Sequence, residues 1–115
     1  MKVSELSGKF GFEAIYQADG DAALVDGYAS DLLSDVMAKA ADDSALVTIQ
    51  AHKNTIAVAS LVGIRAVVIC NERPVPDDMI EAAKAEAVSI FRTPKTQFEV
   101  SGLLYGELRA TGPRG

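Results

Sequence analysis

Short runs of apolar, β-branched residues alternate with helix-like segments of about ten residues along most of this 115-residue chain. The clearest runs are ALVTIQ (45–50) and IRAVVIC (64–70), and the second is apolar almost throughout. A strand without polar alternation is typical of a sheet that is covered on both faces. The sequence therefore predicts an α/β fold with a three-layer α/β/α arrangement and a mostly parallel sheet of about five strands.

The other elements follow the same pattern. An amphipathic opening with Val3 and Leu6 precedes a first strand, FEAIYQA (12–18), and four strand-then-helix passages follow. The remaining strands are ALVDGYAS (23–30) and VSIFR (88–92), and the predicted helices cover 31–40, 54–62, 76–87 and a last segment that ends near residue 108.

Local signals mark the helix ends. Ser30 and Asn54 are predicted N-caps, Pro76 fits the first position of its helix, and Gly63 fits the position after a last turn. The last helix has two candidate starts, either Thr93 before Pro94 or a capping box formed by Thr96 and Glu99.

The apolar periodicity predicts which side chains face the core. On the first long helix these are Leu32, Leu33, Val36, Met37 and Ala40, and on the last helix they are Phe98, Leu103, Leu104 and Leu108. Gly27 inside a strand predicts a bulge or a close backbone approach. The segment from Ile56 to Val62 is apolar on every side, which predicts that one face packs on a second copy of the chain. Ala57, Ala59 and Ser60 would allow that close approach, and the alternative is cover by the chain's own opening or tail.

Composition restricts the class of protein. The length fits one domain, which we place at residues 1–110 with a frayed tail at 111–115. The formal net charge is −5 without a basic run, which argues against nucleic-acid binding. A single cysteine, Cys70, the absence of a signal-peptide pattern at the start and the shortness of the apolar runs predict a cytoplasmic protein without membrane association. We expect Cys70 to be a buried thiol.

Polar side chains gather where the predicted strands end and the next helices begin. Because the carboxyl ends of parallel strands share one edge of a sheet, we expect these side chains to form a common rim. The candidate ligand-binding residues are Ser30, Asp31, His52, Lys53, Asn54, Asn71, Arg73, Thr93 and Thr96.

The chemistry of such a rim favours anions. Helix N-termini present unpaired N–H groups and partial positive charge, and Lys53 and Arg73 add full charges. A nucleotide or another small anionic ligand is the predicted occupant. The alternative is that these residues are polar only because helix starts need caps.

Enzyme motifs are missing. The chain has no GxxxxGK[ST] phosphate loop, no GxGxxG after a strand and no GxSxG, and one histidine cannot build a multi-histidine metal site. Asp31 with Asp35 is more typical of solubility charges than of a metal pair, so we expect no metal. Ser30 or Ser34 with His52 as nucleophile and base is conceivable but has no supporting spacing. The prediction is a non-enzymatic protein.

Three segments together resemble the small stand-alone DRTGG-domain proteins, which are related to the N-terminal domain of HPr kinase/phosphorylase. The segments are ASDLLSDVM (29–37), VTIQAHKNTIAVASL (47–61) and TQFEVSGLLYGEL (96–108), and the resemblance extends from Val3 to about Leu108. The name-giving signature differs. His52-Lys53-Asn54 stands at its Asp-Arg element, and Cys70-Asn71-Glu72 stands at its Thr-Gly-Gly element.

The resemblance implies an α/β/α fold, dimer formation and a regulatory or ligand-sensing role beside a catalytic partner. Stand-alone members are often encoded near iron-only hydrogenase genes, which implies a hydrogenase-related partner or a link to central metabolism. Their common label of serine kinase is unsupported here, because kinase chemistry in that family lies in a separate phosphate-loop domain. The alternative function is a homodimeric interaction module for a redox-enzyme partner, with no small ligand.

Overall fold

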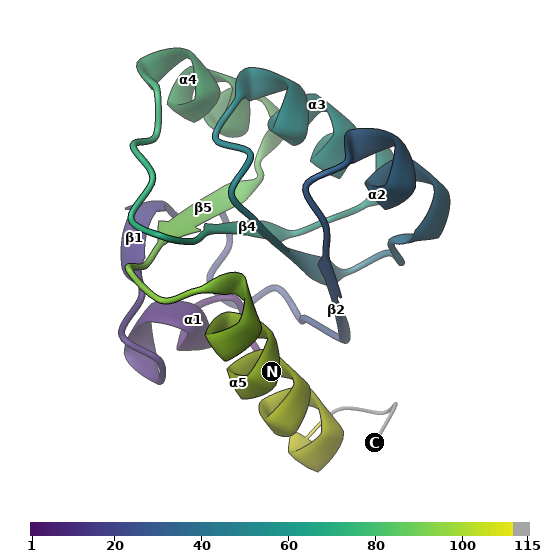
Figure 1. Ribbon diagram of the computed structural model, residues 1–115, viewed down its shortest axis with the longest axis vertical. Coiled ribbons are helices and arrows are strands. Elements are labelled where there is room, and N and C mark those ends of the chain that lie inside the picture. The colour runs from purple at the N-terminus through teal and green to yellow at the C-terminus, as the bar shows by residue number, and fades with distance from the viewer. Residues whose placement is uncertain (112–115) are drawn as a thin grey trace.

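A five-stranded sheet lies between two layers of helices in the computed structural model, which describes residues 1–111 (Figure 1). The strands are β1 (Glu13–Tyr16), β2 (Asp26–Ala29), β3 (Ser44–Thr48), β4 (Ala66–Ile69) and β5 (Ser89–Arg92). Their order is β1-β5-β4-β3-β2, with β2 to β5 parallel and β1 antiparallel to β5. The predicted three-layer α/β/α fold with a mostly parallel sheet is confirmed.

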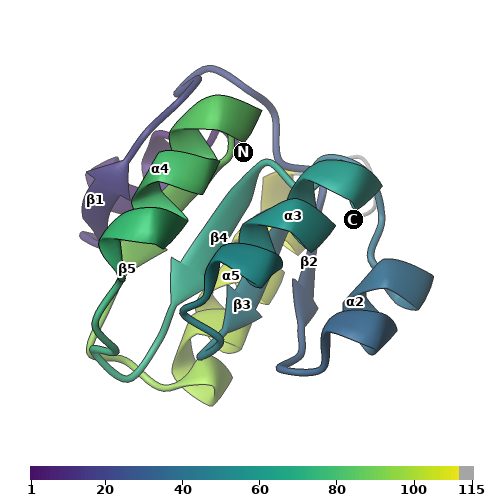
Figure 2. The ribbon, with the colours of Figure 1, turned by 90° about the horizontal axis from the view of Figure 1, so that it is seen from above.

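The helices divide between the two faces of the sheet. On one face α2 (Leu33–Lys39), α3 (Lys53–Val62) and α4 (Asp77–Glu86) lie side by side, and on the other lie α1 (Glu5–Gly8) and α5 (Gln97–Thr111), as Figures 1 and 2 show. The order from β2 to β5 never reverses, and parallel crossovers are almost always right-handed, so α2, α3 and α4 fall on the same face. After β5 the chain crosses to the opposite face, where α5 packs on β2 and β3.

Buried side chains alternate along the central strands. In β4, Val68 belongs to the core beneath α5, whereas Val67 and Ile69 belong to the core beneath α3 and α4. Each fully buried side chain of this size contributes about 1.5–3 kcal/mol. Two cores, one on each face, explain why this strand is apolar throughout.

Two predicted helix ends are confirmed. Gly63 ends α3 in the left-handed conformation, with φ of 83°. At the start of α5, Thr96 Oγ1 accepts a hydrogen bond from the Glu99 N–H at 3.2 Å, and Glu99 Oε1 accepts one from the Thr96 N–H at 3.0 Å. This reciprocal pair is the predicted capping box, so the alternative start at Thr93 is wrong.

Other predicted helix starts are wrong by one or two residues. The first residue of α2 is Leu33, with Leu32 at the N-cap, and Ser30 Oγ accepts from the Leu32 N–H ahead of the helix. The delay has a cause, because Asp31 between them is hydrogen-bonded to the end of β3. Pro76 is the N-cap of α4 and precedes the first helical residue.

Several side chains that were predicted to face the core are exposed. Leu32, Met37, Phe98 and Leu103 point to solvent, while Val36, Leu104 and Leu108 are buried. The outer sides of α2 and α5 have no further layer against them, so only the stripe of each helix that meets the sheet is covered.

The apolar helix α3 is covered on its flanks by its neighbours in the same chain, whereas Ala57 and Leu61 are exposed. It packs between α2 and α4 (Figure 2), and Ala59 is fully buried there. Ser60 Oγ donates to Glu86 Oε2 at 2.7 Å at the junction with α4. The expectation that Ala59 lies against a second copy is therefore wrong, as is cover by the opening or the tail, and a homodimer as such stays a prediction.

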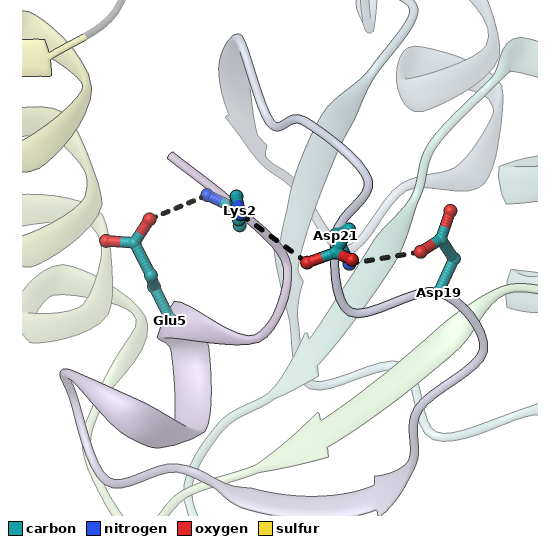
Figure 3. A network of polar contacts seen from close by, with 4 residues as sticks. All are labelled: Lys2, Glu5, Asp19 and Asp21. Carbon is teal, nitrogen blue, oxygen red and sulfur yellow. Dashed lines mark hydrogen bonds and ion pairs between the residues drawn. The ribbon is translucent and has the colours of Figure 1, made fainter.

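The opening segment is tied to the loop that follows β1. Val3 and Leu6 are fully buried beneath the sheet. Figure 3 shows polar contacts of this segment. The Lys2 N–H donates to Glu5 Oε1 at 2.9 Å, and Lys2 Nζ lies 3.5 Å from Asp21 Oδ1. The Asp21 N–H in turn donates to Asp19 Oδ1 at 3.0 Å.

The remaining predictions concern Gly27 and the chain end. The β2–β3 register is regular at Gly27, so the predicted bulge is wrong. A Cβ there would lie 3.8 Å from Leu108 Cδ1, which is an ordinary contact. The helix α5 extends through Thr111, and the rest of the predicted tail lies outside the described residues. Within residues 1–111, the helices are all too short or too polar to cross a bilayer.

Candidate functional site

The carboxyl ends of β2, β3, β4 and β5 meet along one edge of the sheet, because these strands are parallel neighbours. The nine predicted residues lie in the segments that follow these four ends, so His52 and Arg73 are on the same side of the molecule. We call this edge the carboxyl rim. The loops of this rim lead to different faces of the sheet. Those after β2, β3 and β4 lead to the layer of α2, α3 and α4, and the loop after β5 leads to α5 on the opposite face (Figure 1).

Asp31 connects the rim loops that lead to the two opposite faces of the sheet. Its Oδ1 atom accepts hydrogen bonds from Thr48 Oγ1 at 2.8 Å, from the Ile49 N–H at 2.9 Å and from Gln97 Nε2 at 3.0 Å. The Asp31 carbonyl also accepts from Gln50 Nε2 at 3.0 Å. One carboxylate thereby joins the end of β2, the end of β3 and the first turn of α5.

The ionised form of Asp31 is the one this arrangement stabilises. Burial by itself would raise the pKa of the carboxyl group. The hydrogen bonds from Ile49, Thr48 and Gln97, with the nearby positive charge of Arg73, outweigh that effect and hold the pKa below 3.8. A fixed negative charge therefore lies at the base of the rim.

His52 starts α3 through its side chain. Its Nδ1 atom accepts a hydrogen bond from the Asn54 N–H at 3.0 Å, so His52, and not Asn54, is the N-cap. An accepting Nδ1 carries no proton, and the free Nε2 then carries the N–H of the neutral ring. His52, Lys53 and Asn54 are exposed, which leaves Nε2 and the Lys53 ammonium directed at solvent or at a ligand.

The turn after β4 has a strained backbone. Asn71 and Glu72 both have left-handed φ values, 59° and 55°, although neither is glycine. Their N–H groups donate to the carbonyls of Lys95 and Thr93, each at 2.9 Å, and so fasten this turn to the loop after β5. Strain of this kind tends to gather at functional sites.

The two threonines after β5 serve the backbone. Thr93 is buried and its Oγ1 accepts from the Lys95 N–H at 3.2 Å, and Thr96 forms the capping box of α5. The Thr96 N–H, followed by its hydroxyl, lowers the pKa of Glu99. Both threonines fit the alternative reading of capping side chains better than direct ligand contacts.

The rim nevertheless carries three cations that, among the described residues, have no carboxylate oxygen within 4.0 Å. Within residues 1–111, Lys53, Arg73 and Lys95 make no ion pair shorter than 4.0 Å, whereas Arg92 pairs with Glu13 and Glu72. Of these three, Arg73 acts on the negative charge of Asp31, and the first turn of α5 reaches Asp31 through Gln97. The sequence reasoning missed Lys95, Thr48, Gln50 and Gln97, although all four lie at or just after strand ends.

The structure does not join every predicted residue. Among the described residues, no hydrogen bond or ion pair links His52, Lys53 or Asn54 with Arg73, Thr93 or Thr96. Of the rim cations, Lys95 lines a shallow depression together with Phe98 and Glu99 of α5. A cavity of about 380 Å³ lies at the opposite edge of the sheet, with Asp42, Arg65 and Glu86 in its lining.

Other candidate groups are accounted for by local contacts. Asp35 accepts from the Tyr28 hydroxyl at 2.7 Å, a bond that raises the pKa of Tyr28, so Asp35 does not pair with Asp31. Cys70 is fully buried, and burial, followed by the charge of Asp31, raises the pKa of its thiol to about 11. Within the part of the chain that the structure describes, no three His, Cys, Asp or Glu side chains lie together as metal ligands would.

Comparison with known proteins supports the fold. No family model and no curated protein matches the chain. A similar solved structure contains the CBS and DRTGG domains of the regulatory region of a pyrophosphatase from Clostridium perfringens, in complex with its activator, diadenosine tetraphosphate. The likeness has a TM-score of 0.69 and 13% identity, and it covers 89% of this chain but 45% of that one. Identity this low shows the fold alone, so membership of the DRTGG family stays a prediction.

Proposed function

We propose that this chain is a regulatory domain that binds a small anionic ligand, such as a nucleotide, at the carboxyl rim and does not itself catalyse a reaction. The observation that carries the proposal is that, within residues 1–111, Lys53, Arg73 and Lys95 make no ion pair within 4.0 Å and follow the ends of β3, β4 and β5, ahead of or at the start of the next helices. Backbone N–H groups at a helix start and a nearby ammonium or guanidinium are the partners that phosphate oxygens bind.

The fixed charge of Asp31 selects among anions. Its Oδ1 is occupied by three donors, so it does not need a ligand, and it repels an anion that enters too deeply. A ligand that carries hydroxyl or amino donors as well as phosphate suits this environment better than a bare anion does. Nucleotides have both kinds of group.

The structural neighbour adds support of a limited kind. The protein of that structure has diadenosine tetraphosphate as its activator, and the likeness covers 45% of a chain that contains CBS and DRTGG domains. Membership of the DRTGG family would fit a sensing role beside a catalytic partner. An association with iron-only hydrogenase or with central metabolism has the family resemblance as its only support.

Thermal unfolding with a panel of nucleotides tests the proposal. The panel contains AMP, ADP, ATP and diadenosine tetraphosphate, with inorganic phosphate as a control for simple anion effects. A ligand at 100 times its dissociation constant stabilises the folded state by about 2.7 kcal/mol, which is a rise in melting temperature on the order of 10 °C for a domain of this size. Titration calorimetry then gives the affinity.

Variants of rim residues test whether the ligand binds at the rim. Lys53→Ala and Arg73→Ala should each weaken binding about tenfold, because each removes a charge-assisted contact worth roughly 1.5 kcal/mol or more. Lys39→Ala is the matched control, since Lys39 is an exposed lysine at the other end of α2. Equal affinities in all three variants would remove the rim from the binding site, and no melting shift with any ligand would refute the proposal.

One observation favours a second candidate, an interaction module for a protein partner with no small ligand. The outer side of α5 exposes Phe98, Gly102, Leu103, Tyr105 and Gly106, which we call the α5 surface. This surface is on the sheet face opposite α3, so binding there would leave Lys53 free. This candidate would be favoured if a protein partner covers α5 and none of the nucleotides in the panel changes the melting temperature.

A further inference from the structure

The α5 surface begins with an aromatic ring that lies next to the carboxyl rim. Phe98 is in the first turn of α5, and its side chain is 89% exposed. The preceding residue, Gln97, donates to Asp31 Oδ1 at 3.0 Å, so this turn is fastened to the rim (Figure 1). A contiguous exposed apolar group of this kind marks an interaction site or a ligand-binding groove.

A shallow depression connects the aromatic ring to a rim cation. It has a volume of about 660 Å³, and its mostly apolar lining includes Lys95, Phe98, Gly102 and Tyr105. Small-molecule sites have volumes of roughly 300–1,000 Å³ and combine an apolar lining with a few polar groups. The same hollow therefore offers an aromatic ring and an ammonium group to one ligand.

The two aromatic rings of this depression differ in what already contacts them. The guanidinium carbon of Arg109 lies 4.9 Å from the centre of the Tyr105 ring, so that ring already has a cation over it. Within residues 1–111, the Phe98 ring makes no contact of this kind and none with another aromatic ring. An exposed aromatic ring is a stacking partner for a nucleobase, because every base has a π-face.

Gly102 leaves the helix backbone beside the Phe98 ring open. It lies one turn after Phe98 on the same side of α5, and a Cβ there would meet no atom within 4 Å. Packing inside the chain therefore does not require glycine, which is less stable than alanine in a helix interior. A planar group that approaches the backbone closely is a physical reason for glycine at this position.

The charges beside the depression suit a phosphate group. Lys95 makes no ion pair within 4.0 Å among the described residues. The Asn71 N–H donates to the Lys95 carbonyl at 2.9 Å, which places the turn that leads to Arg73 against the Lys95 loop. Glu99 also lines the depression, but its Oε1 accepts from the Thr96 N–H at 3.0 Å in the capping box. Two rim cations thus belong to loops next to the aromatic ring.

The exposed area suits a small ligand. An aromatic side chain buries about 150–250 Å², so Phe98 and Tyr105 at their present exposure offer about 300 Å². A stable protein–protein interface covers about 800 Å² on each partner, so a protein would have to extend well beyond this surface. A nucleobase needs only the ring and the backbone next to it.

We propose that the ligand of the carboxyl rim is a nucleotide whose base stacks on Phe98 and lies over Gly102, with its phosphates at Lys95 and toward Arg73. This inference rests on the proposed function, and it adds the class of ligand and the place of the base. A sugar phosphate or a small carboxylic acid lacks the aromatic ring that this surface binds. The site therefore selects a nucleotide over the same phosphates without a base.

Titration calorimetry of the full chain with matched ligands tests this inference. ATP and inorganic tripolyphosphate carry the same number of phosphates, and AMP and ribose 5-phosphate differ by the base alone. Each nucleotide should bind more tightly than its base-free counterpart. Phe98→Ala should weaken ATP binding about fivefold or more and leave tripolyphosphate binding unchanged. Lys95→Ala should weaken both about tenfold. Leu61→Ala is the matched control, because Leu61 on α3 is 71% exposed and should have no effect.

A fluorescent variant reports on the place of the base. The chain contains no tryptophan, so Phe98→Trp introduces a single fluorophore that keeps an aromatic ring at the proposed stacking position. ATP should quench its emission, since a stacked base contacts the indole, and tripolyphosphate should not. Leu61→Trp is the matched control and should respond to neither ligand.

The outcomes separate this inference from the proposed function. If tripolyphosphate binds as tightly as ATP, or Phe98→Ala keeps the full affinity for ATP, the base does not stack on Phe98 and the inference is overturned. The same holds if ATP leaves Phe98→Trp unquenched or quenches Leu61→Trp equally. In each of these cases an anion still binds, so the proposed function stands. If none of the four ligands binds, the proposed function fails and this inference fails with it.

Discussion

The hydrogen bonds of Asp31 allow a quantitative test of how the rim is held. Asp31→Ala removes the acceptor of the Thr48 hydroxyl, the Ile49 N–H and the Gln97 amide. A hydrogen bond to an ionised group contributes about 1.5–3 kcal/mol, and a buried donor without a partner costs about 1–3 kcal/mol. Thr48 is buried, whereas Gln97 can turn to water. We therefore expect the free energy of unfolding to fall by about 3 kcal/mol.

That loss corresponds to a decrease in melting temperature of about 12 °C, since about 1 kcal/mol shifts a domain of this size by roughly 4 °C. Urea unfolding followed by circular dichroism measures the free energy directly. Asp35→Ala is the matched control, because Asp35 accepts one hydrogen bond from Tyr28, and its loss should be about 1 kcal/mol. Equal losses for Asp31→Ala and Asp35→Ala would refute the reasoning that Asp31 joins three segments.

The effect should depend on pH with a definite sign. The pKa of Asp31 in the folded chain lies below 3.8 and therefore below its value in the unfolded chain. The stabilisation by the carboxylate is then fully present above pH 4 or so, and it is lost as the pH falls through the folded-state pKa. The difference between the wild type and Asp31→Ala should shrink below pH 3.8. A difference that is constant from neutral pH down to pH 3 or so would contradict an ionised, hydrogen-bonded Asp31.

Three further predictions concern single residues. Ala87 ends α4 in the left-handed conformation with φ of 56°, so Ala87→Gly should raise the free energy of unfolding by about 0.5–1 kcal/mol. Ala57→Gly on the exposed side of α3 should instead lower it by about 1 kcal/mol. Melting curves compare the two variants, and a change of the same sign in both would contradict the left-handed assignment. In the same assay His52→Ala should destabilise the chain by about 1 kcal/mol, because the cap of α3 is lost, and His52→Asn should restore most of that stability. If His52→Ala leaves the stability unchanged, the imidazole does not cap α3. Cys70, buried and with its pKa raised to about 11, should react with a thiol reagent at the rate of unfolding, and rapid labelling of the folded chain would contradict its burial.

The strands and two of the helix ends could be predicted from sequence because their causes are local. β4 has apolar side chains on both of its faces, which is required only of a strand with a layer on each side. Gly63 and the pair Thr96 and Glu99 act through their own backbone, so their spacing is sufficient to place a helix end. The position of the rim followed as well, since parallel strands end on one edge.

The contacts within the rim could not be predicted in the same way. Asp31 and Gln97 are far apart in the chain and meet only because α5 returns to the opposite face of the sheet and starts beside the end of β2. The early position of His52 as a cap was missed because an imidazole nitrogen is an uncommon acceptor at an N-cap. Neither contact has a periodic pattern in the sequence that would reveal it.

The sequence by itself determined the kind of secondary structure, the alternation of strands and helices that makes the sheet mostly parallel, and the edge at which polar residues gather. Only the tertiary structure decided that Ala59 of α3 is buried between neighbouring helices while Phe98 and Tyr105 stay exposed on α5. The physical reason is that hydrophobic burial has no direction: an apolar helix face requires cover, but its residues do not specify which neighbour supplies it.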